Sequence, residues 1–288
     1  MAIDVLIKQK LFNRKPMPLE VILGDDLHYG NFVDDKLNVG ELGECEFIAY
    51  NPQSIGRGFS VIWNPFEKKA ISLRLPQPST TQELKDFYSA IARMVKYWDA
   101  KLVVDGNRLH LDSFISSLQD MIDFNEKIIQ QLSQQILDEE HDTLTLCSTM
   151  WPLSISKEEA KRFLNNSDGY AEWLHERQIM DVNFASPDFC VGDNGFFGRF
   201  YLMNRLPSIF PYRPKVPLGA TDPETGKQLE CDQWRIVLGI EGETESLCEM
   251  EYSKFLSRIP NSKMTRYDGE HFLLAELTED ELKKISTQ

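Results

Sequence analysis

Hydrophobic and polar residues alternate regularly between residues 59 and 76. Apolar side chains occupy every second position in two runs: Phe59, Val61 and Trp63, then Ile71, Leu73 and Leu75. A period of two is typical of β-strands that bury one face, and Asn64-Pro65 between the runs has turn chemistry. The pattern therefore predicts a β-hairpin.

The period then changes to that of an α-helix. Thr80 and Glu83 fit a capping box, in which the hydroxyl and the carboxylate accept from N–H groups of the first turn. The apolar residues that follow share one helical face: Leu84, Phe87, Tyr88, Ile91, Met94, Val95 and Trp98. Such a helix needs a packing partner. We expect it to pack on the hairpin and on a strand at residues 102–104, which ends in an Asp105-Gly106 turn.

The remaining segments predict a mixture of strands and helices. Residues 1–58 contain short apolar clusters separated by glycines, which indicates short strands and turns. A long amphipathic helix is predicted over residues 113–137, and further helices begin near Ser156, Ser246 and Thr278. Strands are predicted near residues 182–205 and 233–240. The fold class is therefore α+β, with antiparallel or mixed sheets packed with helices.

The length of 288 residues suits one large domain or two ordinary ones. We place an N-terminal α+β unit at residues 1–148 and a C-terminal α+β unit at residues 149–288, which can also pack as one compact domain. Strand and helix patterns precede an Asp-Gly turn in both halves, at Asp105-Gly106 and at Asp268-Gly269. Two interpretations of this similarity remain: the units arose by duplication of one α+β unit, or they are unrelated and share only a common type of turn.

Acidic residues give the chain a formal net charge of -14. They concentrate in residues 105–142 and 222–251, each of which contains nine acids and two bases. A negative surface repels phosphates, so we expect no direct nucleic-acid binding. Two interpretations remain for the acidic segments: a contact surface for a basic protein partner, or a solvated face.

Several features indicate a cytoplasmic protein. No apolar run approaches the roughly 20 residues that span a bilayer, so we expect no membrane association. The N-terminal MAIDVLIKQKLF has no small-residue cleavage site and predicts a strand, not a secretory signal. The five cysteines are odd in number and widely spaced, which argues for a reducing compartment and against a disulfide framework.

Two clusters combine carboxylates with a histidine, a donor set that suits a divalent metal. They are Asp25, Asp26 and His28, and Glu139, Glu140 and His141. Adjacent residues on a turn seldom converge on one ion, so a loop is the competing interpretation of the first cluster. The competing interpretation of the second cluster is a solvated linker after a helix.

Common catalytic and cofactor motifs are missing from the sequence. Gly56-Arg57-Gly58 lacks the third glycine and the following helix of a nucleotide-binding loop. The sequence has no G-x-S-x-G or H-E-x-x-H motif, and its five histidines are scattered. We therefore assign no catalytic residue and no cofactor.

One stretch resembles a known family. ISLRLPQPST at residues 71–80, followed by ELKDFY at residues 83–88 and closed by Asp105-Gly106, resembles the central segment of an uncharacterised bacterial domain-of-unknown-function family of about this length. The resemblance implies a bacterial intracellular protein with no assigned activity. No functional residue is carried over from it.

These observations favour a non-catalytic intracellular protein that binds another macromolecule through acidic surfaces. The alternative is a small-molecule enzyme or a metal-dependent hydrolase with its site at one of the two carboxylate-histidine clusters. A deep pocket that gathers histidine and carboxylates would favour the enzyme. A flat acidic face with a large apolar patch would favour binding.

Overall fold

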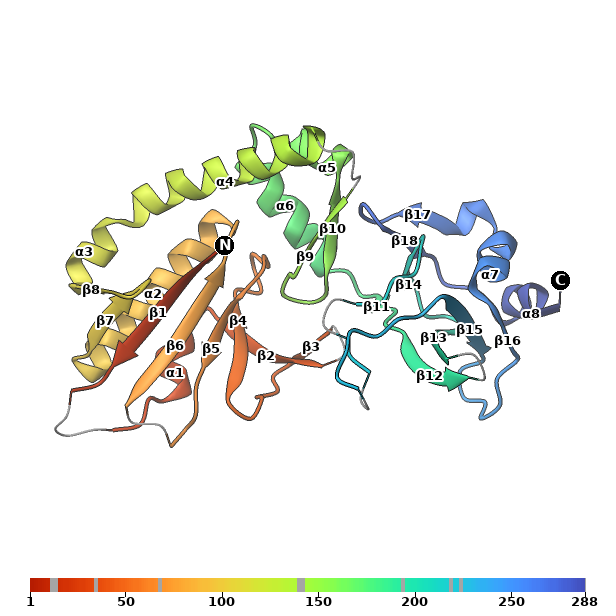
Figure 1. Ribbon diagram of the computed structural model, residues 1–288, viewed down its shortest axis with the longest axis horizontal. Coiled ribbons are helices and arrows are strands. Elements are labelled where there is room, and N and C mark those ends of the chain that lie inside the picture. The colour runs from red at the N-terminus through yellow and green to blue at the C-terminus, as the bar shows by residue number, and fades with distance from the viewer. Residues whose placement is uncertain are drawn as a thin grey trace. The chain divides into compact units, whose positions relative to one another are not determined.

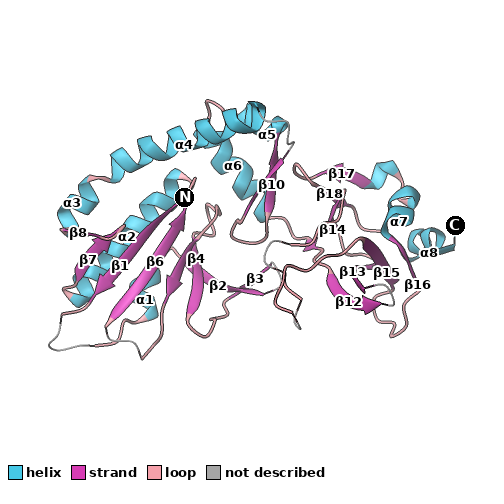
Figure 2. Ribbon diagram, viewed as in Figure 1, coloured by secondary structure: helices cyan, strands magenta, loops and turns pink. Residues whose placement is uncertain are grey.

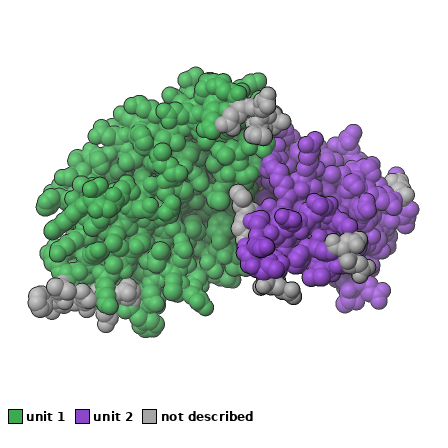
Figure 3. Space-filling view, in the orientation of Figure 1, with its two compact units in different colours: residues 1–180 green, residues 181–288 purple. Residues whose placement is uncertain are grey.

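The computed structural model describes residues 1–10, 15–33, 36–66, 69–138, 143–192, 195–217, 220–222 and 225–287. The chain divides into two compact units, Met1–Met180 and Asp181–Gln288 (Figure 3). The sequence placed this division after Ser148. Residues 149–180 belong with the first unit because they hydrogen-bond into it. Tyr170 donates to the Pro78 carbonyl, and the Gln178 amide donates to the Gly56 carbonyl.

Unit 1 is built on an eight-stranded sheet with the order β3-β2-β4-β5-β6-β1-β7-β8 (Figure 1). Its strands are β1 (Ala2–Lys8), β2 (His28–Val33), β3 (Lys36–Val39), β4 (Glu46–Tyr50), β5 (Phe59–Ile62), β6 (Ala70–Pro76), β7 (Lys101–Val104) and β8 (Asn107–Leu109). All neighbouring strands are antiparallel. The predicted hairpin is β5–β6, and β1 lies between β6 and β7.

Helix α2 (Thr81–Trp98) packs its apolar face on this sheet. Thr80 and Glu83 form the predicted capping box. Phe87 is fully buried and Trp98 is 4% exposed. The ring of Phe87 meets that of Phe59 in β5 edge-on, with 5.3 Å between the centroids. The prediction of an amphipathic helix across the hairpin is therefore confirmed.

Other parts of unit 1 differ from the predictions. Residues 19–23, read as part of a strand-and-turn region, form helix α1 (Leu19–Leu23), which is too short for its periodicity to identify it. The helix predicted over residues 113–137 is divided into α3 (Leu111–Ser116) and α4 (Leu118–Asp138). Between them the Ser117 hydroxyl donates to the Phe114 carbonyl at 2.7 Å, a back-bond that often bends helices.

A β-hairpin and two helices complete unit 1. They are β9 (Thr143–Leu146), β10 (Leu153–Ser156), α5 (Lys157–Phe163) and α6 (Ser167–Gln178) (Figure 2). Ser156 is the N-cap residue of α5, at the predicted helix start, and forms a capping box with Glu159. In the parts of the chain that the structure describes, every helix is too short or too polar to cross a bilayer.

Unit 2 contains two four-stranded sheets, with the orders β12-β13-β15-β16 and β11-β14-β18-β17. Its elements are β11 (Asn183–Phe184), β12 (Asp188–Gly192), β13 (Gly195–Met203), β14 (Ser208–Pro211), β15 (Gln233–Gly239), β16 (Cys248–Glu251), α7 (Tyr252–Arg258), η1 (Asn261–Lys263), β17 (Met264–Arg266), β18 (His271–Leu274) and α8 (Glu279–Thr287). Strands β13 and β15 are parallel, as are β11 and β14. The α+β class is therefore confirmed, and the strand orders of the two units differ.

One predicted helix in unit 2 begins later than expected. Residues 246–258 were predicted to be helical, but residues 248–251 form β16, which pairs antiparallel with β15. Met250 is buried in the core while its neighbours Glu249 and Glu251 are exposed. An alternation of four residues is too short to distinguish a strand from the first turn of a helix.

Candidate functional site

Of the two predicted carboxylate-histidine clusters, the structure describes the first. Asp25, Asp26 and His28 lie exposed between α1 and the start of β2. Glu139, Glu140 and His141 lie outside the described residues. Among the residues that the structure does describe, no three His, Cys, Asp or Glu side chains form a group that could hold a metal ion.

The carboxylates of Asp25 and Asp26 act on a half-buried arginine. Arg93 of α2 donates from Nε and Nη2 to the carbonyls of Val21 and Ile22, at 3.1 and 2.7 Å. Burial lowers the pKa of the Arg93 guanidinium, and the negative charge of Asp26 opposes this shift. The negative charges of Asp26, Asp86 and Asp25 thus favour the charged form of Arg93, which holds the end of α1.

A buried polar cluster joins two loops of unit 1 at the start of α2. We call Arg57, Pro78, Glu83, Tyr170 and Gln178 the Glu83 cluster. The Glu83 carboxylate accepts from the backbone N–H groups of Thr80 at 2.8 Å and of Gly58 at 2.6 Å, and from that of Arg57. The capping box therefore also holds the loop at residues 51–58.

Side chains from distant parts of unit 1 complete the cluster. Arg57 Nε donates to the Cys147 carbonyl at 2.9 Å, and Nη1 donates to the Pro78 carbonyl at 3.2 Å. The Tyr170 hydroxyl also donates to the Pro78 carbonyl at 3.2 Å, and Gln178 Nε2 donates to the Gly56 carbonyl at 2.7 Å. Segments more than a hundred residues apart are thereby joined around one carboxylate.

The close contact at residue 56 requires a glycine. A Cβ there would lie 2.3 Å from the carboxyl carbon of Glu83, which is only 4% exposed. Burial raises the pKa of Glu83, although backbone N–H groups and the Arg57 charge lower it in part. Burial also raises the pKa of the Tyr170 hydroxyl.

The geometry of the Glu83 cluster suits an anchor and not a reactive group. The Glu83 carboxylate is buried and already binds three backbone N–H groups, so it has little access to a substrate. The sequence motif at residues 71–80 and 83–88 supplies Pro78 and Glu83. We therefore interpret this motif as one that specifies the fold.

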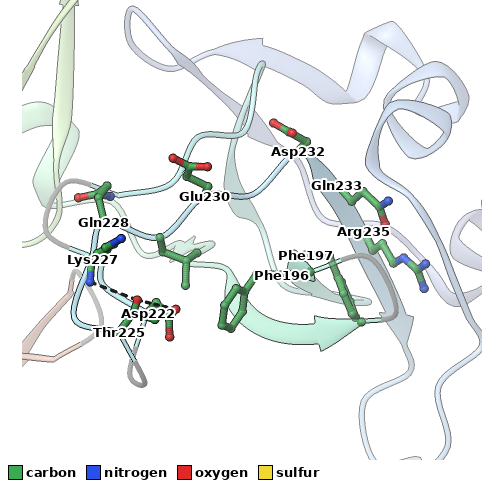
Figure 4. A pocket seen from close by; sticks show the side chains of 13 residues that line it. Phe196, Phe197, Asp222, Thr225, Lys227, Gln228, Glu230, Asp232, Gln233 and Arg235 are labelled. Carbon is green, nitrogen blue, oxygen red and sulfur yellow. Dashed lines mark hydrogen bonds between the residues drawn. The ribbon is translucent and has the colours of Figure 1, made fainter.

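A hollow of about 850 Å³ lies in unit 2 between the β12–β13 hairpin and residues 222–235 (Figure 4). Its described lining contains three acids and no histidine: the acids are Asp222, Glu230 and Asp232. Arg235 is already engaged, because it pairs with Glu249 at 3.4 Å and packs over the Phe197 ring at 4.8 Å. The hollow therefore belongs to the second acidic segment and lacks the histidine-carboxylate set of an acid-base site.

The fold and these sites define an α+β protein of two compact units in which buried polar groups hold loops in place. Residues 2–285 match the family model described as Domain of unknown function (DUF4299), and the chain belongs to this family. The family resemblance of residues 71–106 is thus confirmed and extends over nearly the whole chain. Searches of curated proteins and of solved structures found no significant match.

Proposed function

We propose that this protein binds a basic partner protein through an acidic surface on helix α4. The observation that supports this proposal is a set of exposed side chains that we call the α4 ridge: Asp120, Asp123, Phe124, Lys127 and Asp138. Their spacing places them on one side of the helix. The ridge lies within the first acidic segment of the sequence.

The acids of the ridge are available to a partner. Within the described residues, Asp120, Asp123 and Asp138 form no ion pair. Asp123 and Asp138 each accept one hydrogen bond at 2.8 Å, from the side-chain amides of Gln119 and Gln134. With three acids and one lysine, the ridge keeps a net negative charge. Such charge speeds association with an oppositely charged surface and selects for it.

An exposed aromatic side chain favours binding over a purely solvated face. Phe124 is 45% exposed beside Asp120 and Asp123. A solvated face needs charge but no exposed phenyl ring, whereas a contact surface needs an apolar anchor. The combination suits a basic amphipathic segment. We place this interaction in the cytoplasm of a bacterial cell, which the family resemblance and the five free cysteines support.

Charge reversal on the ridge is expected to weaken binding of a basic amphipathic probe. The probe is a fluorescein-labelled helical peptide of lysine and leucine, titrated at low salt and followed by fluorescence polarisation. Asp120→Lys with Asp123→Lys should weaken binding by at least about tenfold, because two attractions become repulsions. Phe124→Ala should weaken it by roughly threefold to tenfold through lost apolar contact. Added salt should reduce the charge effect and leave the Phe124 effect.

The matched control changes net charge equally on another helix. Glu172→Lys with Glu176→Lys alters exposed acids of α6. If the ridge is the contact surface, this control reduces affinity much less than the ridge variant does. Equal losses in the two variants would show that the peptide responds to net charge alone and would contradict the proposal.

A further inference from the structure

The sheet of unit 1 has a second face, opposite the one that packs on α2. Along β1 the burial alternates, so that Ile3, Val5 and Ile7 lie in the core and Asp4 and Lys8 are exposed. The same alternation continues along β4, β5 and β6. One side of the sheet is therefore buried under helices, and the other, which we call the open face, is presented to solvent.

The strand registers place a row of six side chains across the open face. From β4 to β8 the row is Glu46, Ile62, Ser72, Leu6, Val103 and Arg108. Each residue is the direct partner of the next on the neighbouring strand. The row thus has an acid at one end, a base at the other and uncharged side chains between them.

A second row, displaced by two residues along the same strands, contains Arg74 of β6 and Asp4 of β1. These two side chains form an ion pair of 3.2 Å at the centre of the face. The midpoint between β6 and β1 is therefore the midpoint of both rows. In each row, an acid on one side of this midpoint has a base at the same number of strands from the midpoint on the other side. The pairs are Glu46 with Arg108 in the first row and Asp4 with Arg74 in the second.

We propose that the open face is a dimer interface with a second copy of this chain. The two-fold axis would run parallel to the strands, between β6 and β1, so each row would face itself in reverse. Glu46 would then lie opposite Arg108 of the partner subunit, and Asp4 opposite Arg74 of the partner subunit. A partner of a single charge sign would match only one end of the row, whereas a second copy matches both.

The apolar positions are complementary in size as well. Leu6 would lie opposite Ser72 of the partner subunit, and Ile62 opposite Val103 of the partner subunit. A hollow of about 330 Å³, lined by Ser60, Ser72 and Leu6 among others, lies at this point of the face. The large Leu6 on one copy thus meets the small Ser72 on the other, which is how two packed sheets interdigitate, and Ile62 and Val103 form an apolar pair beside them.

The size of the open face sets the expected affinity. Six strands spaced at about 4.8 Å, with outward residues over roughly 14 Å of strand, give a footprint of about 24 by 14 Å. Such a patch is small beside the interfaces of permanent dimers. The dimer is therefore expected to be weak and reversible.

A charge-swap experiment on the full chain tests this dimer. Analytical ultracentrifugation should show a concentration-dependent dimer of the wild type. Glu46→Arg or Arg108→Glu alone should weaken it by at least about tenfold, because each change makes two symmetry-related pairs repulsive. An equimolar mixture of the two variants should dimerise again, since their reversed charges then face one another. The doubly substituted chain should also dimerise.

Two controls separate dimerisation from folding and from net charge. Both positions are exposed, so thermal melts by circular dichroism should match the wild type. Glu20→Arg in α1 and Lys161→Glu in α5 change net charge equally away from the open face and should leave the dimer unchanged. A wild type that stays monomeric up to about 0.5 mM would overturn the proposal. So would a dimer that is insensitive to both single reversals, or a mixture that fails to recover.

Discussion

Replacing Glu83 with alanine is expected to lower the free energy of unfolding of unit 1 by roughly 3–5 kcal/mol. The substitution leaves the backbone N–H groups of Arg57, Gly58 and Thr80 without their acceptor in a buried site. Each unsatisfied donor costs about 1–3 kcal/mol, and water that enters the space recovers part of this loss. Urea unfolding followed by far-ultraviolet circular dichroism measures the change.

The matched control is a capping box at the surface. Thr278 and Glu281 form the same motif at the start of α8, where the Glu281 carboxylate accepts from the Thr278 N–H at 2.8 Å. This carboxylate is partly exposed, so water can replace it as an acceptor. Glu281→Ala should therefore cost less than about 1 kcal/mol. Similar losses at Glu83 and Glu281 would mean that Glu83 acts only as a helix cap.

The pH dependence of stability gives a second readout for Glu83. Burial raises its pKa above the ordinary value of 4.5, so the folded chain retains a proton that the unfolded chain has lost. The Glu83 contribution to stability should then fall as the pH rises through the range above 4.5. Glu83→Gln cannot titrate, so the wild type should lose stability relative to this variant over that range. A wild type that instead gains stability relative to Glu83→Gln as the pH rises would show that the N–H groups keep the carboxylate ionised.

Glu83 also shows how far the sequence predicts this site. The capping box could be recognised because Thr80 and Glu83 are three residues apart and satisfy each other locally. The donors Arg57 and Gly58 are 26 and 25 residues away, and Tyr170 lies 92 residues from Pro78. Periodicity and short motifs do not specify hydrogen bonds between residues so far apart in the sequence. The buried anchor was therefore missed although its helix was predicted.

The same distinction holds for the fold. The β5–β6 hairpin and α2 were predicted because their periodicity is local and their segments are adjacent in sequence. The place of β1 between β6 and β7 depends on pairing over long separations, which periodicity does not specify. The open face follows only from this strand order. Its charges at Glu46 and Arg108 are unremarkable in the sequence until the registers align them.

Replacing Phe87 with alanine is expected to destabilise unit 1 by about 3–5 kcal/mol. Phe87 is fully buried between α2 and the sheet, with its ring edge-on to that of Phe59. The substitution removes the apolar burial of the ring and leaves a cavity that the β5–β6 strands cannot fill without distortion. Urea unfolding again measures the loss, which should appear as a lower transition midpoint with little change in slope.

Phe124→Ala is the matched control, because it removes the same ring from an exposed position on α4. Its effect on the free energy of unfolding should stay within about 0.5 kcal/mol. The two phenylalanines should thus separate stability from binding: Phe87→Ala lowers the unfolding midpoint, whereas Phe124→Ala lowers affinity for the basic peptide. If Phe124→Ala destabilised the protein as much as Phe87→Ala, its ring would have to be part of the core, and the α4 ridge would lose its apolar anchor.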